Sequence, residues 1–325
     1  MAKKAKPIDL KTLIAVIRKA KTFLVATHVN PDGDGLGSIL ALGEGLRKLG
    51  KKVVIYTADA VPKMYHFMPG QARIAHEINP KAKFDVSFIV DLGEVERVGE
   101  AFVAHPGRGL TVSLDHHAKG DHNAELNYCL PKQASSGEVI FKLLKALKIK
   151  ITKSMATNIY TAMVTDTGSF KYSNTTTETF AIAAELTKLK IDVWEVALNC
   201  FETFSAARME LLKRIMAALV LHSSKKVASI TIALKDLEET GAAPDEAEGF
   251  INYPRSIEGV EVAIAFKETE PGKYKLSLRS KHYVDVAAIA QSFGGGGHIR
   301  AAGCKIDGDF ATVREAILAK VLPQL

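Results

Sequence analysis

Carboxylates and histidines recur where apolar runs of this sequence end. The first group lies in the segment THVNPDGDGLGS, residues 27–38, directly after the apolar run FLVA. This segment places His28, Asp32 and Asp34 close together. A tight turn needs glycines, but it does not need two carboxylates and an imidazole. These side chains are ligands for divalent cations, so the segment is a candidate for metal binding.

Similar residues end three later segments. Asp91 follows DVSFIV, the sequence SLDHH ends with Asp115, His116 and His117, and Asp166 begins DTGSF. Each aspartate alone could be a turn former or a helix cap. If they converge, however, their carboxylates repel one another unless cations lie between them. Oxygen ligands with histidines and no thiolate favour Mn²⁺ or Mg²⁺ over structural Zn²⁺, and two such metals about 3.5–4 Å apart are typical of phosphoester hydrolysis.

The strands and helices predicted around these residues indicate an α/β fold. Four apolar, β-branched runs without polar alternation predict strands of a parallel sheet, buried on both faces, at 23–27, 52–57, 85–93 and 109–117. Amphipathic periodicity predicts helices over 8–20, 37–50, 135–148 and 152–170. In open α/β sheets ligands bind at the carboxyl ends of the strands, so we expect the polar residues to meet there.

The second half of the chain predicts a smaller α/β domain. The pattern is helical from 180 to 221, with 194–222 as a connecting helix, and later strands favour a mostly antiparallel, mixed sheet. These strands are expected at 226–234, 260–268 and 273–280, and helices at 285–293 and 309–322. We therefore expect a catalytic domain, a helical linker and a substrate-binding domain over residues 1–190, 191–222 and 223–325.

The motifs HVNPDGDGLGS, DLG, SLDHH and TDTGSF resemble, in this order, the four motifs of the DHH phosphoesterase superfamily. The segment that runs from SLRS to GGGGHIRAAG resembles the DHHA1 domain of that superfamily. The resemblance covers nearly the whole chain, and the length is similar to that of the bifunctional oligoribonuclease and pAp phosphatase branch rather than to the longer RecJ exonucleases. It implies an N-terminal DHH domain with a parallel sheet, a linking helix, and a cleft closed by DHHA1.

The resemblance also implies a role for each site residue. One metal would be held by His28, Asp32 and Asp91. The other would be held by Asp34, Asp91, His116 and Asp166, so that Asp91 bridges both. Asp115 would orient a histidine, and His117 would contact the scissile phosphate as a ligand or as an acid. Which of His116 and His117 ligates a metal stays open at this point.

The run GGGGH at 294–298 is a candidate anion site. Consecutive glycines expose N–H groups, and the following HIRAAG could start a short helix; a flexible hairpin is the alternative. An arginine fork in LSLRS suits a phosphate group. The substrate-binding candidates are Arg279, Ser280, Gly295, Gly296, Gly297 and His298.

Composition limits the class of protein. The chain has 325 residues and a net charge of +7, but residues 206–325 carry 16 Lys and Arg against 15 Asp and Glu. A long polyanion would need a basic track, so we expect short substrates. The three cysteines form no C-x-x-C pattern, so we expect reduced thiols. No apolar run is long enough to span a bilayer and no apolar signal segment is evident, so we expect a cytoplasmic protein without a membrane partner.

We therefore expect an enzyme that uses two Mn²⁺ ions, with Mg²⁺ as the alternative, to direct hydroxide at phosphorus. Its expected substrates are very short RNA (nanoRNA), cleaved to mononucleotides, and pAp, dephosphorylated to AMP. A homodimer is compatible with this interpretation. The alternatives are hydrolysis of cyclic di-AMP or pApA, hydrolysis of inorganic polyphosphate, and a non-catalytic nucleic-acid-binding module. The complete set of candidate metal ligands argues against the last.

Overall fold

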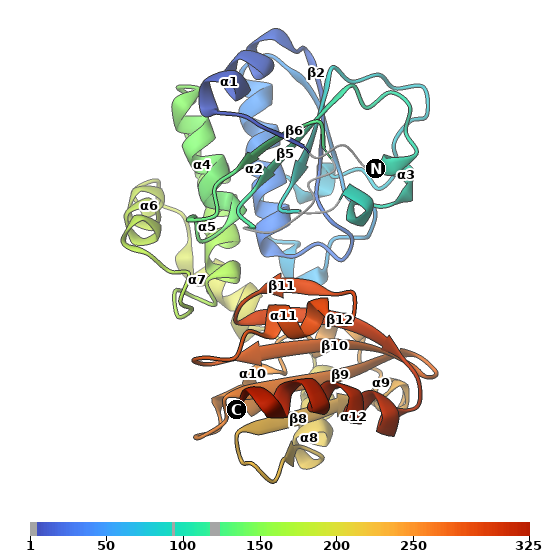
Figure 1. Cartoon of the computed structure of the whole chain (residues 1–325). Helices are drawn as coiled ribbons and strands as arrows, with labels where there is room; N and C mark the ends of the chain where they lie inside the picture. Colours follow the sequence, from blue (N-terminus) through green and yellow to red (C-terminus); the bar gives the residue numbers. More distant parts are fainter. Residues whose placement is uncertain (1–4, 93–94, 118–123) are drawn as a thin grey trace. The chain divides into compact units, whose positions relative to one another are not determined.

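The computed structural model describes residues 5–92, 95–117 and 124–325, and the chain divides after Thr203 into two compact units (Figure 1). The first unit contains the predicted parallel sheet, with strand order β1-β6-β5-β4-β2-β3 and every pair parallel. Its strands are β1 (Lys6–Pro7), β2 (Thr22–Ala26), β3 (Lys52–Tyr56), β4 (Val86–Val90), β5 (Leu110–Asp115) and β6 (Leu126–Cys129). The short strands β1 and β6 were not predicted, because they are too brief to show a pattern.

Helices cover both faces of this sheet (Figure 1). The larger core packs one face against α1 (Leu10–Lys19), α2 (Gly33–Lys48), α4 (Ser136–Ala146) and α5 (Lys153–Asp166). A smaller core packs the other face against a 3₁₀ helix (Val95–Val98) and α3 (Glu100–Val103). Strand residues divide between the two cores by alternation, as expected for a sheet buried on both sides. The unit is completed by α6 (Thr177–Thr187), α7 (Val193–Ala197) and a π-helical turn (Leu198–Glu202).

Helix α2 begins earlier than predicted. It starts at Gly33 rather than Gly37, and the side chain of Asp32 caps it by accepting a hydrogen bond from the backbone N–H of Gly35 at 2.9 Å. A Cβ atom on Gly37 would lie 2.3 Å from the carbonyl oxygen of Asn158 in α5. The glycines of this segment therefore allow α2 and α5 to approach closely, instead of forming the tight turn that the sequence suggested.

The second unit contains a mixed sheet with strand order β11-β12-β10-β9-β8-β7, in which only β8 and β9 pair in parallel. Its strands are β7 (Val220–Leu221), β8 (Val227–Ile232), β9 (Val262–Glu270), β10 (Lys273–Ser280), β11 (Gly296–His298) and β12 (Ala301–Asp307). One face packs on α11 (Val286–Gln291) and α12 (Phe310–Val321). The other packs on α8 (Ala206–Ala217), with α9 (Leu234–Thr240) and α10 (Asn252–Ser256) nearby. Among all helices in the described ranges, none is long and apolar enough to cross a bilayer.

Two secondary-structure predictions are wrong. The expected continuous connecting helix is broken: Thr203 is extended, Ser205 caps a new helix, and residues 220–221 form β7. The short helix expected after the glycine run is also absent, because His298 ends β11 and Ala301 begins β12. The segment from Ala301 forms a strand instead of a helix because it pairs with β10. Pairing between distant segments leaves no local pattern in the sequence.

A buried carboxylate anchors the turn that follows β10. Glu261 is only 3% exposed, and its side chain accepts hydrogen bonds from the backbone N–H groups of His282, Tyr283 and Val284 at 2.8–3.0 Å. Burial alone would raise the pKa of this carboxyl, but the three N–H donors outweigh burial and lower it. The ionised form is therefore favoured in the folded chain.

We predict that Glu261→Gln lowers the free energy of unfolding by about 1–3 kcal/mol near pH 7. The three N–H groups donate to Oε1, and a neutral amide oxygen accepts them more weakly than a carboxylate does, while the NH₂ group faces the N–H of His282. Since the folded-state pKa lies below the unfolded one, this stabilisation is present above the unfolded pKa and is lost as the pH falls through the folded-state pKa. Urea unfolding near neutral pH and in acid measures the difference. The exposed Glu258→Gln is the control, and an equal stability of Glu261→Gln and wild type at neutral pH would refute the anchor.

Candidate metal centre

Three strand ends bring the predicted residues together. The strands β5, β4 and β2 are neighbours in a parallel sheet, so their carboxyl ends lie at one edge. His28 follows β2, Asp91 directly follows β4, and Asp115 ends β5. The first turn of α2 adds Asp34, and the last residue of α5 adds Asp166. Gly93 of the DLG motif lies outside the described residues.

The side chains form two groups that meet at Asp91. In each group the potential ligand atoms lie within 4.8 Å of one another; the groups are His28, Asp32 and Asp91, and Asp34, His116 and Asp166. One oxygen of Asp91 lies 3.7 Å from His28 Nε2, and the other lies 3.6 Å from His116 Nε2. Asp91 therefore faces both groups at once, as a bridging residue must.

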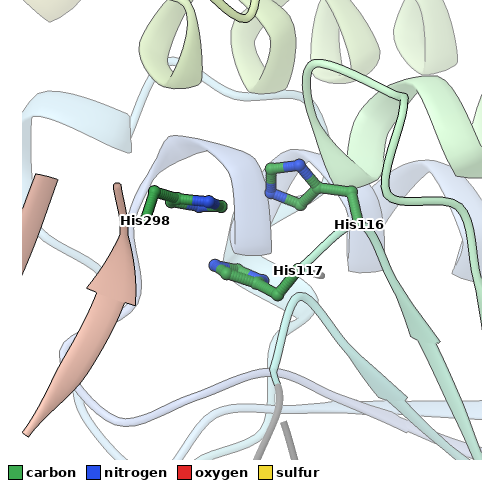
Figure 2. A group of neighbouring side chains, drawn as sticks. All are labelled: His116, His117 and His298. Atoms are coloured by element: carbon green, nitrogen blue, oxygen red, sulfur yellow. The ribbon is translucent and has the colours of Figure 1, made fainter. Parts of the chain in front are cut away.

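The two adjacent histidines, drawn as sticks in Figure 2, have different hydrogen-bond partners. Their rings lie 4.6 Å apart at the end of β5, whereas His298 in the same view belongs to β11 of the second unit. His116 Nδ1 lies 3.2 Å from the carbonyl oxygen of Gln133, which leaves Nε2 facing the carboxylates. His117 Nδ1 lies 2.7 Å from Asp115 Oδ1. This geometry favours His116 over His117 as a metal ligand, with Asp115 orienting His117.

His116 Nε2 lies close to three carboxylates. It is 3.7 Å from Asp34 Oδ2, 3.6 Å from Asp91 Oδ1 and 3.7 Å from Asp166 Oδ2. Burial and the nearby charges of Asp91 and Asp166 raise the pKa of Asp34 well above its ordinary value. Burial, together with Asp91 and Asp32, raises the pKa of Asp166 to about 7.

The group of His28, Asp32 and Asp91 also brings carboxylates close together. Burial of His28 would lower its pKa, but the carboxylates of Asp32 and Asp91 outweigh burial and raise it to about 10. A divalent cation between these groups would offset the repulsion among the carboxylates. The donor set, oxygen-rich with imidazole nitrogen and no thiolate, fits Mn²⁺ or Mg²⁺. The buried His/Asp clusters therefore suggest a metal site.

Helix α4 contributes contacts that the sequence interpretation missed. The backbone N–H groups of Ser136 and Gly137 donate to the two oxygens of Asp34 at 2.7 and 2.9 Å. The hydroxyl of Ser136 donates to Asp91 Oδ1 at 3.0 Å. The N-terminus of a helix favours a carboxylate, so α4 holds Asp34 in place. The SSGE segment that begins α4 was recognisable only as a helix start.

Asn174 is a second residue that was missed. Its Nδ2 lies 3.2 Å from Asp166 Oδ2 and 3.0 Å from the carbonyl oxygen of Ala134. It therefore links the carboxylate of Asp166, at the end of α5, to the segment before α4. No motif in the sequence distinguished this asparagine from an ordinary turn residue.

Within the second unit, the structure places Arg279 and His298 in one row. Arg279 of β10 pairs with Ala301 of β12, and Ala301 pairs with His298 of β11. Residues paired directly across antiparallel strands point to the same face, so the two long side chains stand about 10 Å apart on either side of a small alanine. This face is the one opposite α11 and α12, since Ala263, the partner of Arg279 in β9, belongs to the α8 core.

The other substrate candidates differ in their surroundings. Ser280 is buried, and its hydroxyl donates to the carbonyl oxygen of Val284 at 2.7 Å, which is a structural contact. A Cβ on Gly295 would lie 2.2 Å from the carbonyl oxygen of Gly303, and Gly297 has φ +140°. A Cβ on Gly296 would meet no heavy atom within 4 Å. Position 295 therefore requires glycine because a side chain would clash, and position 297 requires it because of its positive φ. Neither reason applies at position 296.

Two family models match the chain. The DHH family, N-terminal domain, matches residues 22–164, and the DHHA1 domain matches residues 224–322. The chain belongs to the DHH/DHHA1 family. The DHH match contains all the candidate ligands except Asp166, which lies just beyond it. The DHHA1 match contains Arg279 and the glycine run.

Relatives of known name resemble this DHH/DHHA1 chain along most of its length. The bifunctional oligoribonuclease and PAP phosphatase NrnA of Thermus thermophilus is 29% identical over 316 residues, which cover 96% of this chain and 94% of that protein. The NrnA of Bacillus subtilis is 27% identical over 297 residues, covering 90% and 92%.

Solved structures show the same fold. An exopolyphosphatase-related protein from Bacteroides fragilis superimposes with a TM-score of 0.87 at 27% identity, covering 97% of this chain and 96% of that one. RecJ from Thermus thermophilus, in complex with Mn²⁺, gives a TM-score of 0.54 at 16% identity, covering 97% and 55%. At that identity the RecJ likeness concerns the fold alone.

We predict that Ser136→Ala lowers Mn²⁺ affinity by about 10–100-fold, because Asp91 loses the hydroxyl that orients its carboxylate. Isothermal titration calorimetry with Mn²⁺ measures the change. The exposed Ser223→Ala is the matched control and should bind Mn²⁺ as the wild type does. Unchanged affinity in Ser136→Ala would mean that α4 positions Asp91 without this hydroxyl.

Proposed function

We propose that this chain is a metal-dependent phosphoesterase that hydrolyses very short RNA to mononucleotides and dephosphorylates pAp to AMP. The observation that carries the proposal is the placement of Asp91 between two His/Asp groups at one sheet edge. Paired metal sites of this kind serve phosphoester hydrolysis. The substrates are inferred from the NrnA relatives, which align with the chain over nearly its whole length.

In this proposal one Mn²⁺ is held by His28, Asp32 and Asp91, and a second by Asp34, Asp91, His116 and Asp166, with Mg²⁺ as the alternative ion. When bound, such ions supply Lewis acidity toward the phosphate and lower the pKa of water. The chain itself fixes the carboxylates through the N–H groups of α4 and excludes bulk water by burying most of the ligands.

His117 is the proposed acid or phosphate ligand. Burial would lower its pKa, but the hydrogen bond and charge of Asp115 outweigh burial and raise it to about 9. The raised pKa favours the protonated imidazole, whose Nδ1–H donates to Asp115 Oδ1 at 2.7 Å. A protonated imidazole can stabilise a phosphate oxygen or give its proton to the leaving oxygen.

Residues 223–325 are the proposed substrate-binding domain, with 1–190 as the catalytic domain and 191–222 as the linker. Arg279 and His298 would contact a substrate phosphate. The guanidinium group of Arg279 can donate two parallel hydrogen bonds to two oxygens of one phosphate. The near-neutral charge of this domain supports a short substrate. The glycine run would let substrate approach the backbone of β11, and Gly296 is the position where an added methyl group tests this without a clash.

A second candidate substrate is inorganic polyphosphate. It is favoured by the likeness to the exopolyphosphatase-related protein from Bacteroides fragilis, whose identity to this chain is close to that of the NrnA relatives. Cyclic di-AMP and linear pApA would use the same metal centre. These substrates differ from short RNA in shape and charge, so rates on a common panel separate them.

We predict that the wild-type chain with Mn²⁺ hydrolyses pAp and 5′-phosphorylated RNA dimers to pentamers fastest, ahead of 24-mers, cyclic di-AMP and tripolyphosphate. Initial rates on this panel give the ranking. The control is Asp91→Asn, since asparagine tolerates the φ of +62° at this position. It should lose at least about a hundredfold in rate on every substrate.

Two outcomes would contradict this interpretation. Fastest turnover of tripolyphosphate or cyclic di-AMP would replace the proposed substrate. Retained turnover in Asp91→Asn would remove the bridging role of this residue.

We also predict that Arg279→Ala raises KM for 5′-phosphorylated substrates about tenfold with little change in kcat, because the fork binds ground state and transition state alike. Arg279→Lys should recover part of the loss through its charge. Lys275→Ala, on the same strand and face, is the matched control. A fall in kcat without a rise in KM would place Arg279 in the chemical step instead.

A further inference from the structure

A cavity with both apolar and charged lining residues lies in the first unit, away from the metal centre. It has a volume of about 230 Å³ and lies between the second half of α2, the 3₁₀ helix Gln71–Arg73 and the first turn of α5. Asp34 and Arg47 lie 13 residues apart on α2, which corresponds to about 20 Å along the helix axis. The cavity is therefore separate from the candidate active site.

Two arginines meet at this cavity with a single carboxylate. Arg47 and Glu44 extend from α2, and Arg73 extends from the 3₁₀ helix. Across the described residues, no carboxylate oxygen lies within 4.0 Å of either guanidinium. Burial and the positive charge of Arg73 lower the pKa of Arg47, and the negative charge of Glu44 offsets part of this effect. Glu44 instead accepts a hydrogen bond from the hydroxyl of Thr152 at 2.6 Å.

The start of α5 borders the same cavity, which it lines through Ser154. Thr152 caps this 14-residue helix, and its hydroxyl oxygen accepts from the N–H of Met155. The N–H groups of the first helical turn have no acceptor within the helix, and the positive end of the helix dipole favours an anion. The hydroxyl of Ser154 lines the cavity as well. Leu40, Ile55 and Pro69 provide an apolar wall beside these groups.

We propose that this cavity binds a phosphate group. Arg47 already donates from Nη2 to the carbonyl oxygen of Val53 at 3.1 Å, so it offers a phosphate dianion its remaining N–H groups and its charge. Arg73 offers the guanidinium fork, whose paired N–H···O bonds match phosphate oxygens. The phosphate could be free or could belong to a mononucleotide; the apolar wall favours the mononucleotide because it offers a surface for an organic group. The inference does not depend on the proposed activity.

Hydrogen–deuterium exchange of the full chain tests this site locally. The chain is saturated with Mg²⁺, held at constant ionic strength with chloride, and titrated with sodium phosphate or with AMP. We expect slower exchange in peptides that cover 68–76 and 150–158. Arg73→Gln should raise the concentration needed for half protection about tenfold, since one charged pair of hydrogen bonds is lost.

Arg18→Gln is the matched control, because Arg18 is exposed at the end of α1 and lies outside the cavity. It should show the wild-type titration. Arg73→Lys keeps the charge but loses the two parallel N–H donors of the guanidinium. A concentration for half protection between those of the wild type and Arg73→Gln supports binding through both the charge and the paired hydrogen bonds. Far-UV circular dichroism and the thermal unfolding midpoint of the Arg73 variants should match the wild type, which shows that they fold.

The two titrations distinguish the sources of the phosphate. Half protection by AMP at a lower concentration than phosphate assigns the site to a mononucleotide, and the reverse order assigns it to free phosphate. Either order supports a phosphate site. Absence of protection with both ligands, or the same titration in wild type and Arg73→Gln, would overturn the proposal.

Discussion

Repulsion among buried carboxylates is the constraint on which the first unit depends. Asp34 and Asp91 are 2% and 5% exposed, and Asp166 lies within reach of the same imidazole. Like charges at this spacing in a low dielectric destabilise a fold unless something compensates them. The chain compensates in part with the N-terminus of α4, whose N–H groups hold Asp34. The remaining excess of negative charge is what a divalent cation would offset.

The scaffold that brings these charges together is a close contact between two helices. Because Gly37 has no Cβ, the backbone of α2 can approach the carbonyl oxygen of Asn158 in α5. That approach sets Asp34, near the start of α2, beside Asp166, at the end of α5. The parallel order β5-β4-β2 adds Asp91 and His116 from the sheet. Neither contribution alone would form the site, which explains why its ligands are scattered across 139 residues of sequence, from 28 to 166.

The sequence predicted much of this arrangement, and the errors have a common physical origin. The long apolar strands, the main helices and the candidate ligands were recognisable because their signals are local: β-branched runs, periodicity, and polar residues at strand ends. The contacts of Ser136 and Asn174 were not recognisable, because a serine at a helix start and an asparagine in a turn are common for other reasons. The segment HIRAAG after the glycine run starts no helix, because β12 pairs with β10 and β11, and this pairing overrides the local preference.

Residue types and their order alone determined the parallel sheet, the family resemblance and the set of candidate ligands for a divalent cation, since each depends on chemistry carried by short segments. Tertiary structure alone decided that His116 Nε2 lies 3.6–3.7 Å from three carboxylates while His117 Nδ1 lies 2.7 Å from Asp115. It also decided that Asp91 lies between two groups, and that Arg279 and His298 share one row of the second sheet. These features depend on distances between segments remote in sequence. Such distances are set by packing and strand register, which no single segment encodes.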